Sequence, residues 1–244
     1  MGDLIRVASL AAGIVSSVAM ASAQPTPVNP HLWVERFTQP VSVDYLSPVR
    51  EVPAGFREAV VSWNAQTPAG SWIEFMLRAR IGTRWTGWYA MGHWSSEYPP
   101  ANRHSVAKQS DADGHVDVDT LHLNDSGTAL QVKAVVHAGE RQSAPLLRAI
   151  AVTTDSDQAA TAIEDHAAWG ADIEVPQRTQ RVMESPDGLG GGGDAWCSPT
   201  SVSMVMAYWA KSLQHPEWDI DVPSAAKGTY DPVYDGCGNW PFNV

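Results

Sequence analysis

Apolar and polar residues alternate along residues 31–154, in short runs rich in Val, Ile, Trp and Tyr. The clearest runs are "EAVVSWNA", "SWIEFMLRARIG", "GWYAMGHW", "HVDVDTLHL", "ALQVKAVVHA" and "LLRAIAVT". A period of two predicts β-strands that bury one face. Turn-forming stretches such as "TPAG", "YPPAN", "DADG" and "NDSG" separate the runs. Short strands at this spacing predict an all-β sandwich domain over residues 31–154.

The pattern changes after residue 154. Residues 155–173 are alanine-rich and polar, which predicts a linker or a short helix. In "SPTSVSMVMAYWAKSL" the apolar residues recur three and four positions apart, at Val202, Val205, Met206 and Trp209. This period predicts a helix that buries these residues as one stripe. Pro199 is tolerated near a helix start, and Ser198 is the expected N-cap. We therefore expect an α+β chain with a second domain over residues 174–244.

The first residues have the pattern of a secretory signal. Arg6 precedes an apolar run that ends at Met20, and the small residues "ASA" follow, so residues 1–23 are predicted to be a signal peptide. A transmembrane anchor is the alternative, but the run is short for a membrane span. The proline-rich residues 24–30 predict an extended linker. We expect a secreted, periplasmic or cell-envelope protein without stable membrane insertion.

Composition and charge exclude several classes of protein. At 244 residues, 44% apolar and 18% charged, the chain is long and apolar enough for one or two folded domains. Its net charge of −11 argues against nucleic acid as a partner, because nucleic acid is itself a polyanion.

The most informative chemistry lies in "GGGGDAWCSPTS", where Cys197 is expected to begin the predicted helix. The free N–H groups and the positive end of the helix dipole favour a thiolate there. The preceding glycines are expected to form a flexible loop. Cys237 is the second of two cysteines, and in an exported protein a Cys197–Cys237 disulfide would block the nucleophile. An unpaired Cys237 in a glycine-rich turn is the other possibility.

Three segments carry a family resemblance: "VPQRTQ" at 175–180, "WCSPTSVSMVMAYW" at 196–209 and "YDPVYDGCGNWPFNV" at 230–244. In this order they resemble the N-terminal part of a C39-like cysteine peptidase domain of the papain-like group. The β region resembles the accessory domain that precedes this domain in some exported bacterial proteins. The resemblance implies peptide or protein substrates and no cofactor. It also implies Cys197 as nucleophile and Gln180 as an oxyanion-hole donor.

The same resemblance implies a histidine as general base, oriented by Asp or Asn. His215 lies 18 residues after Cys197, on the order of 20–27 Å along a helix, so it is out of reach. His166, the nearest upstream histidine, is expected to be solvated. The resemblance therefore implies that the sequence stops inside the catalytic domain, and we expect little peptidase activity from this chain.

Two further clusters have competing interpretations. Asp113, His115, Asp117 and Asp119 alternate along "DADGHVDVDTLHL". They form either a cation site or a solvated strand face without metal. We expect the solvated face, because one row of carboxylates cannot surround a cation.

The second cluster is aromatic and contains Trp85, Trp88 and Trp94. These residues belong either to a tryptophan-rich core or to a cell-wall or glycan-binding surface. The β domain would then be the working part of the protein. A papain-like amidase or acyltransferase is a third possibility, because the same thiolate chemistry serves each.

Overall fold

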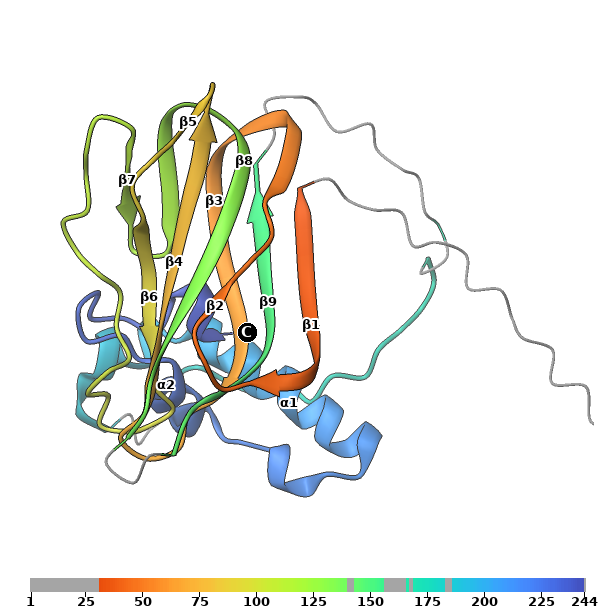
Figure 1. Ribbon diagram of the computed structural model, residues 1–244. Helices are drawn as coiled ribbons and strands as arrows, with labels where there is room; N and C mark the ends of the chain where they lie inside the picture. Colours follow the sequence, from red (N-terminus) through yellow and green to blue (C-terminus); the bar gives the residue numbers. More distant parts are fainter. Residues whose placement is uncertain (1–30, 140–142, 156–165, 167–168, 183–185, 244) are drawn as a thin grey trace, which may run out of the picture.

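The computed structural model describes residues 31–139, 143–155, 166, 169–182 and 186–243. The predicted signal peptide 1–23 and linker 24–30 lie outside the described residues, as does most of the predicted linker 155–173. Strands make up the described chain up to residue 154, and helices follow from residue 186 (Figure 1).

The strand region is an antiparallel sheet. Its strands are β1 (Leu32–Val41), β2 (Tyr45–Leu46), β3 (Arg50–Gln66), β4 (Trp72–Ile81), β5 (Arg84–Trp85), β6 (Tyr89–Trp94), β7 (Gly114–Asp117), β8 (Thr120–His137) and β9 (Leu146–Thr154). Hydrogen bonds join them in the order β1-β9-β3-β8-β4-β5, with β2 and β7 also on β8 and β6 on β4. The chain is thus β-rich with a smaller helical part, but this pairing does not confirm two separate sheets of a sandwich.

The two longest strands bend and change partners. The first half of β3 pairs with β8, and its second half pairs with β9. β8 runs through "NDSG", where the sequence predicted a turn, and that prediction was wrong. A side chain at Gly127 would come within 2.8 Å of the Phe56 ring, so the glycine lets β3 and β8 approach closely. Long-range pairing here overrides the local turn signal.

One face of β4 packs into the main hydrophobic core. Its residues Ile73, Phe75, Leu77 and Ala79 are fully buried, as the alternation in "SWIEFMLRARIG" predicted. Phe75 stacks on Trp63 of β3 with ring centroids 4.0 Å apart. Burying a side chain of this size stabilises a fold by about 1.5–3 kcal/mol, so this strand anchors the sheet.

The helical part has its own small core. It comprises η1 (Pro186–Asp194), α1 (Cys197–Leu213), η2 (Pro216–Trp218), α2 (Val222–Thr229) and η3 (Trp240–Asn243). Trp196, Val222, Ala226 and Cys237 are buried together. Within the described residues, no helix is long and apolar enough to cross a membrane.

The predicted buried stripe of α1 is wrong. The buried residues are the smaller ones, Pro199, Thr200, Ser203, Ala207 and Ala210. Val205 and Trp209 are instead 50% and 47% exposed. Small side chains let α2 pack closely against α1, and spacing alone could not show which of two stripes does so. Ser198 is also not the N-cap, because the helix begins at Cys197 and Trp196 precedes it without a side-chain cap.

A buried arginine connects the strand region to the helical region. Arg103 is fully buried, and its guanidinium donates to the carbonyls of Ser95 and Glu97 at 3.0 and 3.2 Å. It also donates to the carbonyls of Tyr230 and Lys227 at 3.1 and 2.6 Å. Burial lowers the pKa of Arg103 to about 10, so the group is still a cation near neutral pH.

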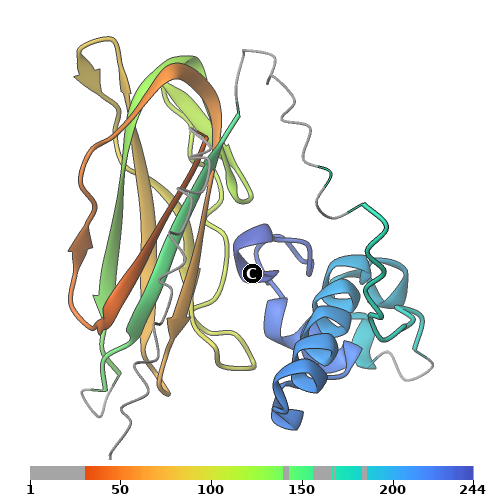
Figure 2. The ribbon, with the colours of Figure 1, turned by 90° about the vertical axis from the view of Figure 1, so that its right-hand side faces the viewer.

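The last described residues complete this contact. Figure 2 shows them between the sheet and α1. Phe242 is buried in the main core and meets Trp63 and Trp94 edge-on or tilted, with ring centroids 6.1 and 5.6 Å away. The strand region therefore holds the C-terminal loop in place.

Candidate functional site

Cys197 is the first residue of α1, and its thiol is exposed and free. The residue before it, Trp196, is fully buried and donates its indole N–H to the carbonyl of Leu189 at 2.8 Å. This anchor fixes the helix start, while Cys197 remains at the surface. The sequence predicted this placement of the cysteine correctly.

The glycine run before Cys197 lies in the 3-10 helix η1 and is closely packed, whereas the sequence predicted a loop. Gly190, Gly191 and Gly192 have positive φ angles of 55°, 85° and 67°. A Cβ at Gly190 would come within 2.9 Å of the Gly236 backbone and 3.2 Å of the Cys237 sulfur. Only glycine combines this conformation with this approach, so the run connects the segment before Cys197 to the loop around Cys237.

Gln180 lies on the other side of the same run. Its side-chain amide donates to the carbonyl of Asp194 at 3.2 Å, three residues before Cys197. A Cβ at Gly193 would come within 2.7 Å of the Gln180 carbonyl oxygen. The fold thus brings Gln180 to the segment that enters α1, although the amide is bonded to Asp194 here.

The two cysteines differ in environment and are not bonded to each other. Cys237 is 1% exposed, and its thiol donates to the carbonyl of Ala226 at 3.5 Å. Burial raises the pKa of Cys237 to about 11. Cys197 is therefore the accessible thiol, and the alternative of a disulfide between them is not found.

His215 is not positioned as a base for Cys197. His215 lies beyond the end of α1, where its Nδ1 donates to the Glu217 carboxylate at 2.8 Å and its ring stacks on Trp218 at 4.2 Å. His166 meets the ring of exposed Trp169 edge-on at 3.8 Å. The 17 residues of α1 span on the order of 25 Å, so His215 cannot take a proton from Cys197.

The acidic row of residues 113–119 does not lie on one solvated strand face. The predicted strand "HVDVDTLHL" is a hairpin of β7 and β8 with Val118 and Asp119 in its turn, and Val118 has a positive φ of 56°. Asp119 is buried and accepts the backbone N–H of Trp240 at 2.7 Å, while Asp113 pairs with Arg84. In the described part of the chain, no group of three or more His, Cys, Asp or Glu could hold a metal.

The three candidate tryptophans are in two different places. Trp94 packs between Trp63 and Phe242, where the C-terminal loop meets the sheet. Trp85 and Trp88 instead lie over the guanidinium of Arg78, each 4.6 Å from it. They therefore do not form one aromatic platform.

Sequence reasoning missed Arg103 and Asp231 and gave Asp119 a different role, and all three position the C-terminal loop. Asp231 accepts the backbone N–H groups of Val233 and Tyr234 at 3.0 and 3.3 Å. The Asp-Pro pair at 231–232 is a turn signal that could have indicated this local structure. No local signal indicates the Tyr230 and Lys227 partners of Arg103, which lie more than 120 residues away.

Comparison with protein families gives two matches that together cover most of the chain. The Peptidase C39 N-terminal domain matches residues 14–155, and the Peptidase_C39 like family matches residues 172–244. Cys197 and Gln180 both lie in the second range. No curated protein and no solved structure matches the chain.

Proposed function

Because this chain belongs to the C39-like peptidase family, we propose that it is an exported cysteine peptidase with Cys197 as its nucleophile. The observation that carries the proposal is the exposed, unpaired thiol of Cys197 at the start of α1, inside the family-matched segment. Helix N-termini favour negative charge, which supports a thiolate at this position. Peptides or proteins are the substrates that such a family suggests. The sandwich and papain-like arrangements and the cell-envelope location belong to the same proposal.

The proposed reaction proceeds in two steps. The Cys197 thiolate attacks the carbonyl carbon, the C–N bond breaks, and the amine leaves with a proton, forming an acyl-thioester. Water then cleaves the thioester, releasing the acid and the free thiol. The developing oxyanion accepts bonds from the Cys197 backbone N–H and the Gln180 side chain. A glutamine amide has two N–H donors, so one can stay on Asp194 while the other serves the oxyanion.

The proposed chemistry also needs a base, and His215 is too far along α1 to act as one. Peptide hydrolysis needs this base, because the leaving amine must be protonated. Acylation by an activated ester needs the base less, because p-nitrophenolate leaves without a proton. We therefore expect the 244-residue chain to be acylated by such an ester but to hydrolyse peptides slowly or not at all.

The experiment is a single-turnover assay with a p-nitrophenyl ester of a short acyl peptide. We expect about one equivalent of p-nitrophenol from the wild type, and none from Cys197→Ala. Gln180→Ala should slow the release by about 10²-fold, the usual effect of losing one oxyanion donor.

Two variants serve as matched controls. Cys237→Ala removes the buried thiol, and Gln177→Ala removes an exposed glutamine of the same segment. Both should acylate at the wild-type rate. Release that persists in Cys197→Ala would contradict the nucleophile, and equal rates for the Gln180 and Gln177 variants would contradict the oxyanion role.

A further inference from the structure

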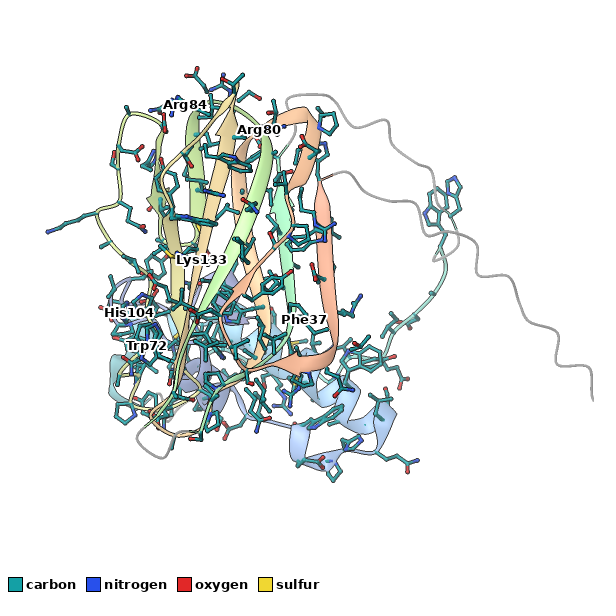
Figure 3. All side chains as sticks on the ribbon, viewed as in Figure 1. Phe37, Trp72, Arg80, Arg84, His104 and Lys133 are labelled. Carbon is teal, nitrogen blue, oxygen red and sulfur yellow. The ribbon has the colours of Figure 1, made fainter. Side chains whose placement is uncertain are left out.

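Cations and indole rings alternate in a row on the sheet. The Lys133 amine lies 4.9 Å from the Trp88 ring, and the Arg78 guanidinium lies 4.6 Å from both Trp88 and Trp85. Arg80 follows at 6.0 Å from Trp85. The order is thus Lys133, Trp88, Arg78, Trp85 and Arg80, and we call these five residues the cation–indole row. Figure 3 labels Arg80 near the β5 end of the sheet and Lys133 lower on it.

The sheet register places the row on one face. Arg78 and Arg80 alternate on β4 with fully buried Leu77 and Ala79, so they point away from the core. Arg78 pairs with Gln131 of β8, and Lys133 lies two residues further along β8. Side chains two apart on a strand share a face, so the two strands present their cations to the same side.

Gln131 holds the central arginine in a fixed orientation. Its side-chain oxygen accepts bonds from Arg78 Nε and Nη2 at 3.2 and 2.5 Å, and its Nε2 donates to the carbonyl of Ser47 at 2.9 Å. Gln131 is buried. The Arg78 Nη1 group is not used in these bonds. A stacked guanidinium keeps its in-plane N–H groups for an anion.

Two cations of the row have no salt-bridge partner among the residues that the structure describes. Arg80 pairs with Glu51, but within the described part of the chain no carboxylate lies in salt-bridge distance of Arg78 or Lys133. The chain as a whole carries a net charge of −11. Acidic groups are therefore plentiful in this protein, yet this face presents unpaired cations.

We infer that the cation–indole row binds an acidic polysaccharide. Each repeat of such a polymer presents a carboxylate and the apolar face of a sugar ring, which matches the alternation of cation and indole. The Arg78 and Lys133 groups bond the carboxylates, and the exposed parts of Trp85 and Trp88 contact the rings. Duplex DNA stacks its rings inside the helix and carries a denser charge, which the net charge of −11 repels. Single-stranded DNA exposes both charge and ring, so it is the competing ligand in the test.

This binding is independent of peptidase activity, so direct titration tests it. Tryptophan fluorescence and calorimetry should detect binding of an oligogalacturonate to the full chain, and no binding of a neutral glucan of the same length. Affinity should fall as salt rises from about 50 to about 300 mM, because screening weakens ionic contacts. The double variant Arg78→Gln/Lys133→Gln should bind at least about tenfold more weakly.

The matched control is Arg36→Gln/Arg148→Gln, which removes two exposed cations from β1 and β9 and should bind as the wild type does. Lys133→Gln alone changes only one contact with Trp88, so it gives a second variant that keeps the fold. Equal binding of the neutral glucan would overturn the inference. So would equal weakening by both double variants, or tighter binding of single-stranded DNA of the same charge.

Discussion

The backbone N–H of Ser105 donates to Asp231 Oδ2 at 2.9 Å, which joins a loop of the strand region to the helical region across 126 residues. Asp231 is fully buried, and its Oδ2 also accepts the side-chain amide of Asn239 at 3.1 Å. A carboxylate is suited to this place because it only accepts hydrogen bonds. The strand region therefore helps to hold the C-terminal loop in place.

Asp231→Asn should lower the free energy of unfolding by about 2–4 kcal/mol. The new side-chain NH2 group would face the N–H groups of Ser105 or Asn239 in a buried site, where two donors cannot bond to each other. Urea denaturation measures the change. Asp235→Asn is the control, because Asp235 is exposed, has a positive φ that Asn tolerates, and accepts a hydrogen bond from the Tyr230 hydroxyl. Equal effects of the two variants would contradict a buried role for Asp231.

Phe242→Ala should destabilise the protein by about 3–5 kcal/mol, the usual cost of truncating a buried phenylalanine. The reason is the cavity left beside Trp63 and Trp94. Thermal unfolding, followed by near-ultraviolet circular dichroism, reports both stability and the tryptophan environment. Trp240→Ala removes a side chain that is 63% exposed and keeps the backbone bond to Asp119, so it should cost far less. A larger loss in Trp240→Ala would show that the loop is held differently.

Gly190→Ala should lower stability by about 2 kcal/mol or more, because the new Cβ would meet Gly236 in a backbone conformation that favours glycine. The same variant should change the alkylation rate of Cys197, since the glycine run leads into α1. Gly228→Ala is the control: nothing lies within 4 Å of its Cβ position in α2. It should raise stability by about 0.5–1 kcal/mol. Unchanged stability in Gly190→Ala would contradict the tight packing.

Stability should fall as pH rises above about 9, with Cys237 as one cause. Burial raises the folded pKa of Cys237 from 9.0 to about 11. The folded state therefore keeps a proton that the unfolded state loses, and its contribution is complete below pH 9 and lost toward pH 11. The slope for one proton is at most about 1.4 kcal/mol per pH unit. Urea denaturation from pH 8 to 10 measures it.

Cys237→Ala should have a shallower slope than the wild type over that pH range. Gly228→Ala is the control, because it removes no titratable group and leaves the Cys237 thiol in place, so it should keep the wild-type slope. A wild-type slope in Cys237→Ala would show that the buried thiol does not contribute.

The sequence by itself determined the local features of this protein. Period-two alternation identified β4, and the glycines, proline and helical spacing placed Cys197 at a helix start. These features depend on neighbours within a few residues, which a sequence pattern contains. The family segments also placed Cys197 and Gln180 in one matched range.

Only the tertiary structure decided which face of a helix is buried and which segments remain extended, because the local sequence allows more than one arrangement. In α1 the smaller side chains pack on α2 and leave Val205 and Trp209 exposed, and "NDSG" stays extended because β3 and β8 pair across it. Asp119 meets Trp240 across 121 residues, and Arg103 meets Tyr230 across 127. Such contacts form only when distant segments of the chain meet in space, so no local sequence pattern encodes them. These same contacts hold the C-terminal loop beside the candidate nucleophile.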